Sequence, residues 1–163
     1  MSPQVSELER VLEQLIAEHK RLLELVDKHQ AAMKTIDLPG MDDLGRQQEA
    51  ARLRITSLEQ RRRALVMQLA RATNQPGELT LGRLAALYPG NAANLLRLRR
   101  DLKAVLEQVA ARTRISAKVS SAVLGHLNTV VRLLAGAVER AGLYTKSGIP
   151  RVSSRIGVME AVG

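Results

Sequence analysis

The three histidines of the chain, His19, His29 and His126, are the side chains best suited to bind a metal ion or transfer a proton. A metal site inside a helix bundle needs Glu-x-x-His pairs on two helices and further inward glutamates. The carboxylates near the first two histidines lie mostly off the apolar positions of that segment: Glu18, Glu24 and Asp27. The sequence also lacks an HExxH motif, an EF-hand pattern and cysteine. We therefore expect no metal and no cofactor, and interpret the histidines as partly buried packing positions.

The sequence contains no candidate nucleophile for covalent catalysis in a suitable motif. The chain has no cysteine, no Gly-x-Ser-x-Gly motif and no glycine-rich loop that would hold a phosphate. Its acidic residues mostly stand four positions from basic ones, as Glu24 does from Lys28 and Glu59 from Arg63. Such spacing is typical of solvated helix faces. We expect a protein that is not an enzyme, with no catalytic residues.

The composition predicts an all-α protein. The 163 residues include no Phe, no Trp and two Tyr, so Leu, Ala and Val supply nearly all the apolar mass. These residues suit helices and leave little from which to build a sheet. No apolar run approaches the roughly 20 residues that a bilayer requires, and the first residues show no signal-peptide pattern. We expect a cytoplasmic protein without membrane insertion.

Two heptad patterns predict an antiparallel pair of helices. In each, apolar positions alternate three and four residues apart, interrupted by a few polar residues. The first seam is Val5, Leu8, Leu12, Leu15, His19, Leu22, Val26, His29, Met33 and Ile36. The second is Met41, Leu44, Gln48, Ala51, Ile55, Leu58, Arg62, Leu65, Leu69 and Ala72. The short break at Leu38-Pro39-Gly40 predicts a hairpin of two similar helices.

A third long helix completes the predicted coiled-coil bundle. Thr80 caps a short connecting helix over 81–87, and Asn91 precedes a helix that runs to about Ala141. The seam of this helix begins at Leu95, Leu98, Leu102, Val105 and Val109. It then widens through Val119, Val123, Leu127, Val130, Val131, Leu134 and Val138. A stripe this wide can face two helices at once. At 1.5 Å per residue the third helix would be much longer than the first two, so it must overhang them or bend. The stretch 112–116 and Gly125 are the candidate weak points for a bend.

The bundle is expected to span residues 1–142, and residues 143–163 form an apolar C-terminal tail. Its content of Gly, Ser and Pro is too high to extend the helix, yet it is richer in apolar residues than a purely solvated tail. We interpret it as a partner-binding segment, with folding back onto the bundle or fraying as the alternative. The candidate binding residues are Leu143, Tyr144, Gly148, Ile149, Val152, Ile156, Met159 and Val162.

The net charge of +9 raises the alternative of a basic helical adaptor for nucleic acid. Arg61-Arg62-Arg63 and the cluster 97–103 are the basic groups that would contact phosphate. Aromatic residues that stack on bases are nearly absent, and no zinc-finger or helix-turn-helix spacing occurs. The arginines equally suit a role in covering apolar surface with their stems. A coiled-coil oligomer of identical chains is the other alternative.

The order of these segments resembles the FlgN-like flagellar export chaperones over nearly the whole length. The matching pieces are LERVLEQLIAEHKRLLELVDKHQAAM, LRITSLEQRRRALVMQL, LGRLAAL, LLRLRRDLKAVLEQV and VLGHLNTVVRLLAGAV, followed by a Y-x-x-x-G tail at residues 144–148. The resemblance implies a cytoplasmic chaperone that binds hook–filament junction proteins, the hook-associated proteins of the FlgK and FlgL type. It implies that the chaperone shields their terminal helices and delivers them to the type III export gate.

The same resemblance gives the C-terminal segment much of the cargo binding, and gives Tyr144 a role in docking to the cytoplasmic domain of the gate. Our own hypothesis is that Val152, Ile156, Met159 and Val162 form one face of a helix in the complex, since they stand three or four residues apart. A tail that folds on binding loses conformational entropy but releases its cargo readily.

Overall fold

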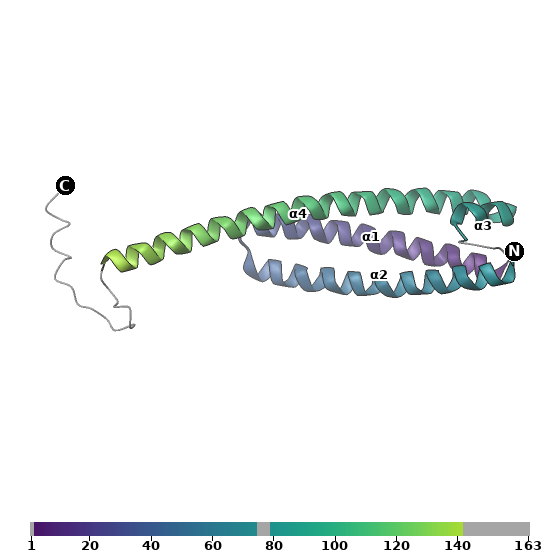
Figure 1. The fold of residues 1–163 in the computed structure, drawn as a ribbon, viewed down its shortest axis with the longest axis horizontal. Helices are drawn as coiled ribbons and strands as arrows, with labels where there is room; N and C mark the ends of the chain where they lie inside the picture. The colour runs from purple at the N-terminus through teal and green to yellow at the C-terminus, as the bar shows by residue number, and fades with distance from the viewer. Residues whose placement is uncertain (1, 75–78, 142–163) are drawn as a thin grey trace. The chain divides into compact units, whose positions relative to one another are not determined.

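The computed structural model describes residues 2–74 and 79–141, with side chains as far as Ala137 in the last helix (Figure 1). Its elements are α1 (Pro3–Thr35), α2 (Leu38–Ala72), α3 (Leu81–Leu87), the 3₁₀ turn η1 (Pro89–Asn91) and α4 (Ala92–Ala141). Within these residues the secondary structure is helical, with no strand. The all-α prediction is therefore confirmed.

The chain divides into two compact units, Met1–Val119 and Ser120–Gly163. The first holds α1, α2, α3, η1 and the first part of α4, and the described part of the second is residues 120–141 of the same helix. Each unit is considered by itself below.

In the first unit, α1 and α2 lie side by side and run in opposite directions (Figure 1). Only Ile36 and Asp37 separate the two helices. The residues of α2 that contact α1 descend in number as their partners ascend: Arg61 with Glu7, Arg54 with Glu18 at 3.1 Å, and Gln48 with the Leu25 carbonyl at 3.4 Å. This order is that of an antiparallel pair.

The first part of α4 runs in the same direction as α1 (Figure 1). Here the partners ascend together: Asn91 donates to Glu9 at 3.0 Å, Arg97 lies 3.5 Å from Glu13, and Arg112 lies 3.6 Å from Asp27. The first bond is half-buried, whereas the ion pairs are exposed and individually weak. Together they mark one register between the two helices.

Helix α1 is buried on a wider face than its heptad seam predicts. Every seam position from Val5 to Met33 is buried or half-buried, as expected. Four further positions outside the seam are also buried: Val11, Ile16, Leu25 and Ala32. Each leucine fully removed from water contributes roughly 1.5–3 kcal/mol. The buried face of α1 is wide because α1 contacts two neighbouring helices, α2 and α4. The seam alone would suffice for contact with one helix.

Two clusters make up the core of this unit. The larger one joins the first half of α1 to the end of α2, to α3 and to the start of α4 through residues such as Leu12, Leu69, Leu84 and Leu95. The smaller one is built from Leu22, Leu25, Val26 and Ala51, with Val109 of α4 packed against it. Leucine and small aliphatic residues fill both, so the core needs no aromatic side chain other than the half-buried Tyr88 beside the first cluster.

The connection between α1 and α2 is tighter than the sequence indicates. Leu38-Pro39-Gly40, expected to form the break, is instead the first turn of α2, where a proline loses no helix hydrogen bond. Asp37 caps this turn by accepting from the Gly40 backbone N–H at 3.1 Å, and a Cβ at Gly40 would collide with that carboxylate. Ile36, predicted to belong to the seam, is 44% exposed and ends α1.

Helices α3 and α4 begin where the sequence predicts. The Thr80 hydroxyl accepts from the Arg83 backbone N–H at 3.3 Å and caps α3, as predicted. Helix α4 begins directly after Asn91 and continues through the stretch 112–116 and through Gly125 without interruption. The predicted weak points therefore do not break the helix. The turn predicted around Pro76-Gly77 lies outside the described residues.

The backbone of Ile36 provides a test of the tight connection. Its φ of 53° and ψ of 41° are left-handed, and the Asp37 N–H to Ala32 O and Ile36 N–H to Met33 O bonds form a Schellman motif, in which glycine usually takes this position. A Cβ in this conformation costs about 1–2 kcal/mol. We expect Ile36→Gly to be about 1 kcal/mol more stable than Ile36→Ala in urea unfolding. Equal stabilities would show that the left-handed residue is not strained.

Candidate protein-binding surface

The described part of the second unit presents an exposed apolar face on α4. Leu124, Val131, Leu133 and Leu134 are each between 61% and 64% exposed, and Leu127 and Val130 are more than one-third exposed. Large apolar side chains that gather on one exposed helix segment are typical of a protein-binding site. We call these six residues the α4 apolar surface.

The spacing of these residues on a helix explains why they gather. Leu127, Val130, Val131 and Leu134 recur three and four positions apart, which places them on adjoining turns of one face. The opposite face carries Ser121, Gly125, Asn128 and Arg132, all exposed. The segment is thus an amphipathic helix whose apolar side is uncovered within the described residues.

This result corrects the prediction that the widened stripe of the third helix contacts two other helices. Among its members, Val119 and Val123 are half-buried, whereas Val131 and Leu134 are exposed. Contact with two helices is instead a property of α1. The exposed residues agree with the expectation, drawn from the helix lengths, that the third helix overhangs the first two or bends, since α1 and α2 have 33 and 35 residues and α4 has 50.

The eight tail residues predicted to bind a partner lie outside the described residues: Leu143, Tyr144, Gly148, Ile149, Val152, Ile156, Met159 and Val162. Their role therefore stays a prediction. The α4 apolar surface precedes them in the sequence, and four of its residues were noted in the sequence only as part of a packing stripe: Leu127, Val130, Val131 and Leu134. Leu124 and Leu133 were missed because they stand beside that spacing.

A shallow depression of about 360 Å³ lies between α1 and α2. It is lined by Gln14, Ala17, Glu18, Arg54, Ser57 and Leu58. The two charged groups pair with each other at 3.1 Å. Their mutual neutralisation leaves this depression without a free charge to hold a ligand.

The basic clusters of the first unit are mostly paired with carboxylates. Arg61 contacts Glu7, and Arg62 and Arg63 both contact Glu59. In α4, the pairs are Arg97 with Glu13 and Asp101, Arg100 with Asp101, and Lys103 with Glu107. Such pairing reduces the positive field that would attract a phosphate backbone.

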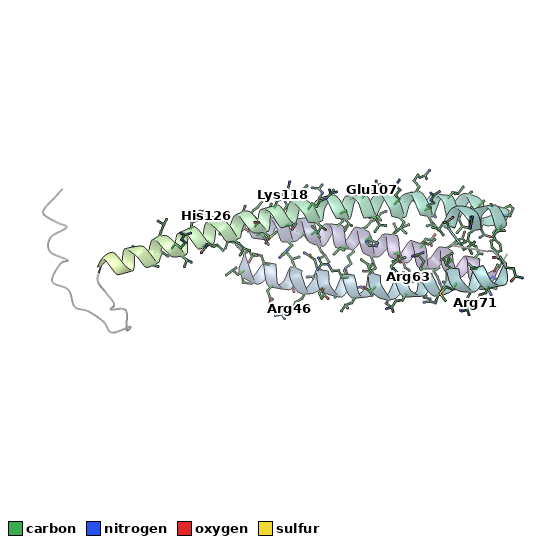
Figure 2. The ribbon with its side chains drawn as sticks, in the orientation of Figure 1. Arg46, Arg63, Arg71, Glu107, Lys118 and His126 are labelled. Carbon is green, nitrogen blue, oxygen red and sulfur yellow. The ribbon has the colours of Figure 1, made fainter. Side chains whose placement is uncertain are left out.

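The histidines occupy three different environments. His19 is buried, His29 is half-buried, and His126 projects exposed from α4 (Figure 2). Among the side chains that the structure describes, no three His, Asp or Glu residues come close enough together to hold a metal ion. Burial lowers the pKa of His19 below its usual 6.5, and the negative charge of Glu59 opposes this shift in part.

No helix in the described part of the chain is long and apolar enough to span a membrane. The polypeptide is thus a chain of long helices with a buried leucine core, and its second unit exposes an amphipathic segment suited to binding another protein.

The chain is similar to a known protein family. A model of the FlgN protein family matches residues 1–151. The chain therefore belongs to the FlgN family, and this membership gives it the role of a flagellar export chaperone that binds flagellar substrate proteins. No curated protein and no solved structure matches the chain. The matched range includes Tyr144 and Gly148 but stops before Val152.

The pKa of His19 predicts a pH dependence of stability. Because the folded protein holds a proton at His19 less tightly than the unfolded chain, stability is full above pH 6.5 and falls as the pH drops through the lowered folded pKa. We expect the urea midpoint to decrease between pH 7.5 and 5, and to decrease less in His19→Leu. The exposed His126→Gln serves as the matched control. A wild-type slope in His19→Leu would contradict this account.

Proposed function

We propose that the chain is a non-enzymatic, cytoplasmic chaperone for the hook–filament junction proteins of the flagellum. It binds terminal helices of cargo of the FlgK and FlgL type and delivers them to the type III export gate. The observation that carries the proposal is the α4 apolar surface: an ordered helix that leaves Val131 and Leu134 exposed in the described structure. The family of the chain supports the class of partner.

The chemistry of the surface suits a helix as cargo. Leucine and valine side chains on successive turns offer ridges and grooves to an amphipathic helix with apolar residues at the same spacing. Such a cargo segment would aggregate if left exposed, because its own apolar face needs cover. Burying the two faces against each other removes both from water. The binding would be reversible, since it needs no covalent step.

The rest of the chain would serve this surface as scaffold and as a docking element. We infer that the three long helices pack as a coiled-coil bundle and hold the first part of α4 rigid. Residues 143–163 would extend the cargo site, with Val152, Ile156, Met159 and Val162 on one side of a helix formed in the complex. Tyr144 would contact the export gate.

The alternative of a nucleic-acid adaptor receives less support. Its candidate arginines at 61–63 already contact Glu7 and Glu59. Nucleic-acid affinity would fall steeply with added salt through counterion release, whereas burial of apolar surface would change little. A salt titration of each type of complex therefore separates the two functions.

Charged residues in the α4 apolar surface test the proposed cargo site. In the double variant Val131→Asp/Leu134→Asp, cargo affinity should fall by about 100-fold or more, because binding would bury unpaired carboxylates. The assay is isothermal titration of the full-length chain with a purified hook-associated protein. The control is Leu53→Asp on α2, which replaces a leucine of similar exposure, 63% against 61% for Val131 and Leu134. Unchanged affinity in the double variant would exclude this surface as the cargo site.

Removal of the tail tests its separate contribution. A chain that ends at Gly142 should lose cargo binding while its circular dichroism helicity stays largely unchanged, because the seam residues of the bundle remain. Titration with the same cargo measures the effect. Cargo affinity equal to that of the full chain would refute the tail hypothesis and leave the α4 apolar surface as the whole site.

A further inference from the structure

The α4 apolar surface is followed in the chain by a second apolar segment. The surface lies between Leu124 and Leu134, and the helix is described as far as Ala141. Residues 143–163 come next in the sequence, and they belong to the same unit, Ser120–Gly163. The length and spacing of this tail show whether it can cover the surface.

The tail carries apolar residues over the same length and at the same spacing as the surface. They stand three or four positions apart, and we call them the tail stripe: Val152, Ile156, Met159 and Val162. The ranges 152–162 and 124–134 contain equal numbers of residues, and each covers about 15 Å in helical form. Valine and isoleucine pack well against leucine, and methionine fills irregular gaps. The tail stripe therefore has the dimensions of a partner for the surface.

The connection between the two segments is long enough for the chain to reverse its direction. Residues 142–151 separate α4 from the tail stripe and include Gly142, Gly148 and Pro150, which favour turns. To place Val152 beside Leu134, this connection must cross the distance of about 9 Å between packed helices and return along about 11 Å of helix. Its extended length is roughly 33 Å. The tail stripe can therefore reach the whole surface.

We propose that the tail stripe lies antiparallel on the α4 apolar surface whenever no other protein is bound there. This arrangement puts Val152 beside Leu134 and Val162 beside Leu124, so that both apolar faces leave water together. The contact within the chain goes beyond the proposed function. Its consequence, that cargo must displace the tail stripe before it binds, rests on that function.

Covalent attachment favours the tail stripe over a second copy of the chain. A segment on a short flexible linker has an effective concentration of about a millimolar, well above that of separate chains in dilute solution. Charge does not oppose the contact, because Arg132, the one Lys, Arg, Asp or Glu within 120–137, lies on the opposite face of α4. The contact stays reversible, since a helix of this length is marginal and the tail stripe includes Gly157, a weak helix former.

The absence of cysteine from the chain allows a direct test, because Val131→Cys introduces a single thiol into the surface. A maleimide reacts with this thiol only while the surface is uncovered. We expect Val131→Cys to react about threefold or more slowly in the full chain than in a chain that ends at Gly142. Two exposed control positions should react equally fast in both chains: Ser121→Cys on the opposite face of α4, and Leu53→Cys on α2.

Charged residues in the tail stripe should uncover the surface again. In the full chain, Ile156→Asp/Met159→Asp should raise the rate at Val131→Cys to that of the shortened chain, because the contact would bury two unpaired carboxylates. The matched control is Ser154→Asp/Ala161→Asp, which adds the same charge on the other side of the helical pattern. This control should keep the rate low.

The thiol assay contains no cargo, so it separates this inference from the proposed function. Equal rates at Val131→Cys in the full and the shortened chain would refute the contact and leave the cargo site standing. A rate that rises when the full chain is diluted would identify a second copy as the occupant and would also overturn the inference. Unchanged cargo binding in Val131→Asp/Leu134→Asp would refute the cargo site alone, and the thiol rates would still decide whether the tail stripe covers the surface.

Discussion

Burial of α1 against two long neighbours is the interaction on which the first unit depends. Its seam leucines contact one side, and Val11, Ile16 and Leu25 extend the buried face beyond the seam. Without Phe or Trp, the core must obtain its apolar area from many leucines along the length of the helices. The result is an elongated core, and stability is distributed over two clusters.

Polar groups give this leucine core its register. A seam made only of leucines tolerates a shift of one heptad, because each leucine then meets another one. The bond between Asn91 and Glu9 and the contact of Gln48 with the Leu25 carbonyl exist in one alignment only. The buried His19 adds a third polar position inside the seam. These groups make the alignment specific, and burial of His19 lowers stability when the pH falls.

Local structure could be predicted from the sequence better than contacts between distant segments. The heptad spacing located α1 from Val5 to Met33, and the hydroxyl of Thr80 marked the start of α3, because both signals depend on neighbouring residues. Spacing does not show how many helices contact a face, so it did not indicate the second buried side of α1, and it placed the exposed Val131 and Leu134 in a packing stripe. The pairing of Asn91 with Glu9 joins residues 82 positions apart, which no local pattern indicates.

The second unit gains its helical order from its connection to α4 of the first. A separate peptide of residues 120–141 would form a helix only marginally, since nucleation is costly and valine and glycine are poor helix formers. Because α4 is continuous and the core holds its residues 92–109, only propagation of the helix is required. An apolar face that is ordered before its partner arrives loses less conformational entropy on binding. The helix that begins in the stable core thus continues into the α4 apolar surface, where the described residues form no core cluster.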